Sequence, residues 1–147
     1  MVKRDTPKSI NQNRVALVTG AATRLGRQIT LTLHEAGFDI CVHCNNSVIS
    51  ANTLVEELNS SRPESAFSIV QDLTVTNFAE NITSMITAKK GRLDLLVNNA
   101  SIFNKTSIAT HGQTLWDQTM STNAKAPYYL SLSSATLLRK NSGSIVN

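Results

Sequence analysis

Apolar and polar residues follow one another in blocks along the 147-residue chain, and the blocks predict alternating strands and helices. Short apolar runs typical of buried strands occupy residues 15–18, 38–44, 66–70 and 93–97. Apolar residues at helical spacing occupy the intervals between them, at residues 25–36, 47–59 and 76–90. A polar connection at residues 98–112 then precedes a long helical pattern at residues 113–139, and a fifth strand covers residues 143–146.

The spacing also predicts which helix faces are buried and where the helices end. The faces expected to pack on the sheet are Leu25, Ile29, Leu33 and Ala36 in the first helix, Leu54, Val55 and Leu58 in the second, and Phe78, Ile82, Met85 and Ile86 in the third. Gly37 and Gly91 stand just beyond the first and third helices, and Arg62-Pro63 ends the second. Pro127 lies inside the long helical pattern and predicts a kink or break near residues 123–126.

Strands that alternate with helices predict a parallel sheet covered by helices on both faces, because crossovers between parallel strands are right-handed. The expected fold class is α/β, a doubly wound Rossmann-type parallel sheet, truncated at the fifth strand by the end of the chain at Asn147. Residues 14–147 form this domain in our interpretation, after a flexible tail at residues 1–13. In such a fold, ligands bind at the carboxyl ends of the strands.

The turn after the first strand reads Thr-Gly-Ala-Ala-Thr-Arg-Leu-Gly at residues 19–26. Gly20 permits a tight turn, and the following helix directs its unpaired N–H groups at one point, where the phosphates of a nucleotide fit. A P-loop is excluded because five residues separate the two glycines and Arg27-Gln28 follows, and the G-x-G-x-x-G pattern fails at Ala22. An ordinary strand-to-helix turn is the alternative for this segment alone.

The residues at the end of the second strand and directly after it are uncharged or weakly basic: His43, Cys44, Asn45, Asn46 and Ser47. An Asp or Glu here would bind the ribose 2′-hydroxyl of NAD, and the sequence has neither. Neutral donors at a helix start, with Arg24 on the glycine segment, suit a 2′-phosphate and favour NADP(H) over NAD. A plain turn with a helix cap is the alternative for residues 45–47.

Two further segments follow strands. Asp72-Leu73 comes after the third strand, where Asp72 either accepts a hydrogen bond from an adenine amino group or caps a turn. Asn98-Asn99-Ala100-Ser101, followed by Phe103, comes after the fourth strand. Its small residues let a flat ring lie against the backbone, and its amides can fix that ring. The order and spacing of these segments indicate one dinucleotide site.

Composition narrows the function classes. The net charge of +4 is spread along the chain except for Lys3, Arg4 and Lys8, which argues against a nucleic-acid surface. The sequence shows neither the apolar core of a signal peptide nor a run long enough for a membrane span, so a cytoplasmic protein is expected. Cys41 and Cys44 lie three apart in a strand, so we expect single thiols buried on opposite faces rather than a redox or metal pair.

Taken in order, these segments resemble the short-chain dehydrogenase/reductase family over residues 14–147. Arg24 stands where that family usually has the middle glycine of its loop, and with His43 and residues 99–103 this resembles the pteridine reductase branch. The branch commonly has an Arg where Asn46 stands, and this departure weakens the argument for a 2′-phosphate. The resemblance implies NADP(H) as cofactor and a pterin-like small molecule as substrate.

The resemblance also implies roles for individual residues. Arg24, Ser101 and Phe103 border the substrate, and Asn123 is the catalytic-site residue at the helix kink that holds a water of the proton relay. The residues expected to contact the cofactor, from the resemblance or from the patterns above, are Gly20, Arg24, Leu25, Gly26, His43, Asn45, Asn46, Ser47, Asp72, Leu73, Asn99, Ala100 and Ser101. No metal site is expected.

The implied reaction is hydride transfer from NADPH to a C=N bond of a pterin or dihydropterin, with a proton supplied to the nitrogen. The family's acid belongs to a Tyr-x-x-x-Lys pair beyond Asn147, and Tyr128 and Tyr129 lack a Lys four residues further on. We therefore interpret the chain as the N-terminal part of a longer enzyme, inactive alone, whose intact form is a homo-oligomer. The alternatives are a non-catalytic nucleotide-binding module and a reductase of another carbonyl substrate, such as a 3-oxoacyl thioester.

Overall fold

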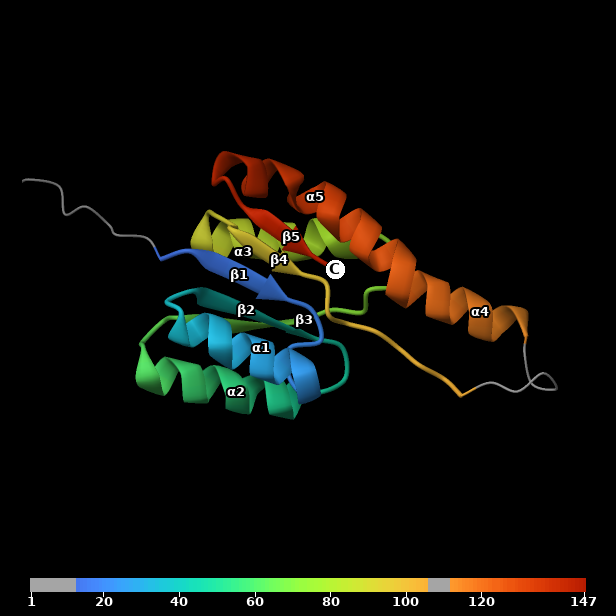
Figure 1. Cartoon of the computed structure of the whole chain (residues 1–147), viewed down its shortest axis with the longest axis horizontal. Coiled ribbons are helices and arrows are strands. Elements are labelled where there is room, and N and C mark those ends of the chain that lie inside the picture. The colour runs from blue at the N-terminus through green and yellow to red at the C-terminus, as the bar shows by residue number, and fades with distance from the viewer. Residues whose placement is uncertain (1–12, 106–111) are drawn as a thin grey trace, which may run out of the picture.

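The computed structural model describes residues 13–105 and 112–147, which form a five-stranded parallel sheet with helices on both faces (Figure 1). The strands are β1 Val15–Val18, β2 Asp39–Cys44, β3 Ala66–Val70, β4 Leu95–Val97 and β5 Ser144–Val146. The helices are α1 Arg24–Glu35, α2 Val48–Ser61, α3 Phe78–Lys90, α4 Gln113–Met120, the π-helical η1 Ser121–Lys125 and α5 Ala126–Lys140. The predicted tail lies outside the described residues except for Asn13, and so do residues 106–111 of the predicted polar connection.

The strand order β3-β2-β1-β4-β5 is that of a doubly wound sheet. From β1 the chain continues to one side through β2 and β3, and it then returns past β1 to β4, so the order reverses between β1 and β4. Val18 pairs with Val42 of β2 and with Val97 of β4, so these three strands reach the same level. The predicted α/β Rossmann-type fold is confirmed, and its switch point lies at the carboxyl ends of β1 and β4.

Two separate cores lie on the two faces of the sheet. Helices α1 and α2 cover one face, and α3 and α5 cover the other (Figure 1). Cys41 belongs to the core under α3 and α5, whereas Cys44 belongs to the core under α1 and α2. Both thiols are free and buried, and burial raises the pKa of each. The prediction of single buried thiols on opposite faces is confirmed.

The buried face of α1 differs in part from the predicted one, since Ile29 and Leu33 pack partly buried against the core as predicted. Gly26, Thr30 and His34 are buried, whereas Leu25 is 67% exposed and Ala36 is exposed as well. A Cβ atom at position 26 would lie 2.1 Å from the carbonyl oxygen of the turn before the helix, so only glycine permits this approach. The prediction for Leu25 and Ala36 is wrong, because the glycine contact fixes the rotation of the helix.

Helix α3 shows a smaller difference of the same kind. Met85, predicted to be buried, is 40% exposed, while Ala79 and Thr83 are buried. The hydroxyl of Thr83 lies 2.9 Å from the hydroxyl of Ser133 on α5, so a polar contact joins the two helices at this point. Small residues allow α3 and α5 to pack closely, and the longer Met85 side chain is directed away from the core.

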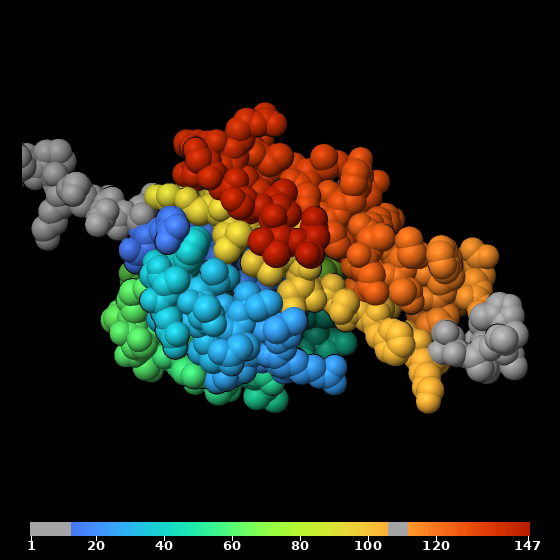
Figure 2. All heavy atoms as spheres, viewed as in Figure 1, coloured from blue at the N-terminus to red at the C-terminus, as the bar shows by residue number. Residues whose placement is uncertain are grey.

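The long helical segment is interrupted, as the sequence predicts. Helix α4 passes into the π-helical turn η1, and Pro127 follows in the first turn of α5. A wider turn accommodates a proline, whose ring would clash with the preceding turn of a regular helix and which cannot donate a hydrogen bond. Helix α4 buries none of its side chains, and it projects beyond the body of the molecule (Figure 2).

Ion pairs and a hydrogen bond join residues at the amino ends of the strands. Asp94, just before β4, accepts hydrogen bonds from the backbone N–H of Val15 at 2.8 Å and from the Arg92 guanidinium at 2.6 and 2.9 Å. Burial by itself would raise the pKa of Asp94, but the hydrogen bonds from Arg92 and Val15 outweigh it and lower the pKa. Asp39, at the start of β2, lies 2.7 Å from the Nζ atom of Lys90 at the end of α3. Charged groups thus hold this edge of the sheet together.

Candidate functional site

A cavity of about 620 Å³ opens at the carboxyl ends of β1 to β4. Its walls come from the turns after these strands and from α4 and η1. The residues predicted to contact the cofactor all line it: Gly20, Arg24, Leu25, Gly26, His43, Asn45, Asn46, Ser47, Asp72, Leu73, Asn99, Ala100 and Ser101. Lining residues that the sequence analysis missed are Ala22, Thr23, Cys44, Thr74, Ile102, Gln118 and Thr122. The fold brings segments from most of the chain into one hollow.

The start of α1 forms one end of this cavity. The chain turns at Gly20, whose φ of +62° lies in the left-handed region that favours glycine. The first hydrogen bond that closes a turn of α1 runs from Arg27 N–H to the Thr23 carbonyl. The amides that precede it, with no carbonyl of an earlier helical turn to bond, are those of Arg24, Leu25 and Gly26. These amides and the positive end of the helix dipole make this corner suitable for an anion.

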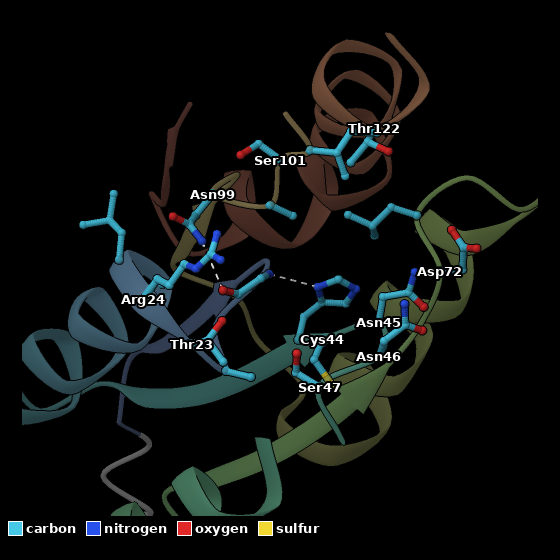
Figure 3. Close-up of a pocket in the computed structure, with 18 of the residues that line it drawn as sticks. Thr23, Arg24, Cys44, Asn45, Asn46, Ser47, Asp72, Asn99, Ser101 and Thr122 are labelled. Atoms are coloured by element: carbon cyan, nitrogen blue, oxygen red, sulfur yellow. Dashed lines mark hydrogen bonds between the residues drawn. The ribbon is translucent and has the colours of Figure 1, made fainter. Parts of the chain in front are cut away.

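Arg24 is unusual in both its conformation and its position. Its φ of +50° places a non-glycine residue in the left-handed region. In the view of Figure 3, Arg24 lies on the side of the cavity where Asn99 lies, and Asn45 and Asn46 lie on the other side. The structure therefore separates the Arg24 guanidinium from residues 45–47, with which the sequence analysis grouped it as a 2′-phosphate site. The guanidinium instead lies toward the switch point between β1 and β4.

Thr19 and Asn99 join the turns after β1 and β4. The Oγ1 atom of Thr19 accepts hydrogen bonds from the backbone N–H groups of Asn99 and Ala100, both at 2.9 Å. In return, Asn99 Nδ2 donates to the carbonyls of Thr19 and Gly20, at 2.8 and 3.2 Å. The Asn99 amide, predicted to fix a bound ring, thus holds the glycine loop in place. Thr19 was not among the predicted site residues, although a hydroxyl directly after a buried strand could have indicated it.

His43 joins the turns after β1 and β3. Its side chain is buried, with Nδ1 3.2 Å from the backbone nitrogen of Gly20 and Nε2 2.9 Å from the carbonyl oxygen of Gln71. Burial lowers the pKa of His43, although the Gln71 carbonyl acts in the opposite direction, so the imidazole is neutral at neutral pH. The structure shows His43 contacting the protein on both ring nitrogens.

The hydrogen bonds in the turns after β2 and β3 bear on two alternatives that the sequence left open. Ser47 stands at the N-cap position of α2, but its side chain makes no capping hydrogen bond there. The helix cap is therefore not its role in this structure. Asp72 Oδ1 accepts hydrogen bonds from the backbone N–H and the hydroxyl of Thr74, at 2.8 and 2.7 Å, so Asp72 does cap a turn. Its predicted contact with adenine stays a prediction.

The predicted substrate side is only partly assembled around the cavity. Ser101 lines the main cavity (Figure 3), whereas Phe103 is 91% exposed and is not among the lining residues. Asn123 borders a neighbouring hollow, and its amide pairs with Ile102: Oδ1 accepts from the backbone N–H and Nδ2 donates to the carbonyl, both at 2.9 Å. Asn123 thereby holds the segment after β4 against η1. Its part in a proton relay and the stacking role of Phe103 stay predictions.

The switch-point cavity, the glycine turn and the Asn-Asn-Ala turn after β4 define the class of protein. The chain belongs to the short-chain dehydrogenase family, whose model matches residues 14–147. Members of this family are oxidoreductases that bind a nicotinamide cofactor. Within residues 13–105 and 112–147, no helix is long and apolar enough to cross a membrane. The cytoplasmic location and the homo-oligomeric intact form stay predictions.

Two of the relatives described next are named for different substrates, and the third is named only as an oxidoreductase. Pteridine reductase 1 of Leishmania tarentolae is 35% identical over 79% of this chain and 51% of its own length. The 3-oxoacyl-[acyl-carrier-protein] reductase FabG of Staphylococcus epidermidis is 32% identical over 92% of this chain and 55% of its own length. An uncharacterized oxidoreductase of Thermotoga maritima is 32% identical over 92% and 52%, respectively. The chain spans about half the length of these curated relatives, and the family resemblance, rather than the branch, is confirmed.

Proposed function

We propose that the protein to which this chain belongs is an NADPH-dependent oxidoreductase that reduces a pterin or dihydropterin. The observation that carries the proposal is Arg24, a cation held in a glycine-like conformation on the Asn99 side of the cavity. A positive φ is unfavourable for any residue except glycine, so an arginine at this place supports a function for its guanidinium. The similarity to a pteridine reductase points in the same direction.

The lining of the cavity supports a dinucleotide as its ligand. The free amides at the start of α1 would hold the diphosphate, and Asn45, Asn46 and Ser47 would bind a ribose 2′-phosphate as neutral donors. No acid occurs at residues 43–47 to repel that phosphate. The small side chain of Ala100 leaves room for a flat ring beside the Asn99 turn. When bound, NADPH supplies the hydride.

The chain's own residues would orient the substrate. Arg24 and Ser101 would contact the pterin, and Asn123 would act as a positioning residue through its two hydrogen bonds to Ile102. A proton must also reach the substrate nitrogen. Tyr128 borders the hollow beside Asn147 rather than the main cavity, so we do not assign the proton to it.

The second candidate is reduction of a 3-oxoacyl thioester, favoured by the similarity to FabG over 92% of the chain. The test is NADPH oxidation by the intact protein with dihydrobiopterin, dihydrofolate and a 3-oxoacyl thioester as separate substrates. Turnover of a pterin supports the proposal. Turnover of the thioester alone transfers the assignment to the second candidate, and NADPH binding without turnover of any substrate indicates a non-catalytic nucleotide-binding module.

A further inference from the structure

We propose that His43 is the positioning residue of the glycine loop: as a neutral imidazole it ties the turn after β1 to the turn after β3, and dinucleotide affinity therefore falls when it is protonated. The inference rests on the proposed nucleotide site. It gives His43 a role in shaping that site, in place of the direct cofactor contact expected from the sequence.

The hydrogen bonds of His43 define one tautomer. The Gly20 backbone nitrogen can only donate, so Nδ1 must accept, and the Gln71 carbonyl can only accept, so Nε2 must carry the hydrogen. The opposite tautomer would direct Nδ1–H at the Gly20 N–H and a lone pair at the Gln71 carbonyl. A protonated ring would also direct a hydrogen at Gly20 N–H. Only the neutral Nε2–H imidazole satisfies both turns.

The Gly20 peptide group is held from both sides. His43 binds its N–H, while Asn99 Nδ2 binds its carbonyl at 3.2 Å. The same carbonyl is the closest neighbour of a Cβ built at Gly26, which means that α1 packs directly on it. Loss of the His43 acceptor leaves a partly buried N–H unsatisfied, and a rotation of the Gly20 peptide to relieve this displaces the start of α1. The amides proposed to bind the diphosphate lie at that start.

The protonation of His43 depends on its burial and on its hydrogen bond to Gln71. Besides His43, the ionisable side chains that line the cavity are Arg24 from α1, Cys44 from β2 itself and Asp72 from the turn after β3. The β4 turn and the start of α2 contribute the uncharged Asn99, Ala100 and Ser47. Burial lowers the pKa of His43 and the Gln71 carbonyl raises it, so the neutral form persists below the ordinary imidazole pKa of about 6.5.

The first test reads the tautomer directly and needs no ligand. Long-range ¹H–¹⁵N correlation spectra of the protein at neutral pH should show a neutral His43 with the hydrogen on Nε2 and an accepting Nδ1. On acidification the Gly20 amide signal should shift together with the His43 signals. An Nδ1–H tautomer, a charged ring at neutral pH, or a Gly20 amide that does not follow His43 would overturn the inference.

The second test uses three variants matched to the two ring nitrogens. In H43N the amide oxygen is attached where Nδ1 is and can accept from Gly20 without titrating, whereas H43Q can retain a donor toward Gln71 and H43L retains neither group. We expect H43L and H43Q to bind NADPH about tenfold more weakly than wild type, and H43N within about threefold. Equal affinity of wild type and H43L contradicts the inference.

The pH dependence separates positioning from packing. The wild-type affinity should fall more steeply than that of H43N as the pH drops below about 6.5, because only wild type carries the titrating ring and its pKa is lowered by burial. The NADPH 2′-phosphate, whose pKa is about 6, titrates with both proteins. Comparing wild type with H43N therefore removes its contribution to the pH dependence. Parallel pH profiles for wild type and H43N contradict the inference, while a wild-type protein that binds no dinucleotide at all contradicts the proposed function, whatever the tautomer.

Discussion

At the amino edge of the sheet, Asp39 and Asp94 gather charged partners, whereas at the carboxyl edge the chain places glycines, amides and a neutral imidazole. Asp94 binds Arg92 and the first residue of β1, and Asp39 binds Lys90 and lies 3.6 Å from Arg62. The carboxyl edge is joined instead by hydrogen bonds between Thr19, Asn99, His43 and backbone groups.

The difference separates stability from binding. The charged groups at the amino edge are paired with one another and are therefore not directed at a ligand. Uncharged contacts at the carboxyl edge fix the loops while leaving the helix amides at Arg24, Leu25 and Gly26 available to an anion. Changes at the amino edge should therefore reduce the free energy of unfolding, and changes at the carboxyl edge should mainly reduce dinucleotide affinity.

The largest effect on stability is expected from Asp94→Ala. It leaves the Val15 N–H and the Arg92 guanidinium without their carboxylate, and breaking such a buried pair costs about 3–5 kcal/mol of unfolding free energy. Urea denaturation measures the loss. Asp117→Ala, which removes an exposed carboxylate from α4, should change stability by less than about 0.5 kcal/mol. Similar losses in both variants would remove the distinction between a structural edge and the rest of the surface.

Gly26→Ala tests the carboxyl edge with the next largest effect. The new methyl group would lie 2.1 Å from the Gly20 carbonyl oxygen and 2.6 Å from Asn99 Nδ2, so α1 must move away from the loop. Overpacking of this kind costs about 1–3 kcal/mol of stability, and displacement of the helix amides should weaken NADPH binding by at least about a hundredfold. Calorimetric titration of folded protein gives the affinity.

The control for this change is Gly112→Ala, where a Cβ meets no atom within 4 Å and φ is not positive. It should bind NADPH like wild type. A folded Gly26→Ala variant with unaltered affinity would show that the start of α1 does not form the anion site.

Arg24 variants should change affinity and stability in opposite directions. Arg24→Gly relieves a positive φ, so the free energy of unfolding should stay constant or rise by up to about 1 kcal/mol. Removal of the guanidinium should weaken NADPH binding about tenfold. Arg27→Ala removes a cation one turn along the same helix, where it pairs with Glu57, and should alter affinity by less than about twofold. Equal losses in the two variants would indicate a general charge effect.

The smallest effect concerns His34 at the amino edge, whose Nε2 lies 2.7 Å from the Ser65 hydroxyl. Burial, followed by the charge of Arg62, lowers the pKa of His34 in the folded state. Stability is therefore complete above the unfolded pKa of about 6.5 and decreases as the pH falls toward the folded pKa. His34→Gln should flatten this decrease in urea unfolding measured at several pH values. A wild-type stability that rises on acidification would reverse the sign and contradict the assignment.

The sequence predicts the order of elements because apolar runs and helical spacing report burial directly. It misplaces the buried face of α1 because the packing of Gly26 against a carbonyl leaves no trace in a hydrophobic pattern. It identifies Asn99 and His43 as site residues but not their hydrogen bonds to Gly20, which depend on how β1, β2 and β4 are aligned. The cavity residues Gln118 and Thr122 are missed for a similar reason, since the direction of α4 and η1 decides what they face.

The central claim is that the carboxyl edge of this sheet binds NADP(H). It is tested most directly by titrating the protein with NADPH and NADH in parallel and measuring both dissociation constants. The account predicts binding of both, with NADPH tighter by at least about tenfold because neutral donors follow β2. No binding of either dinucleotide, or tighter binding of NADH, would contradict it.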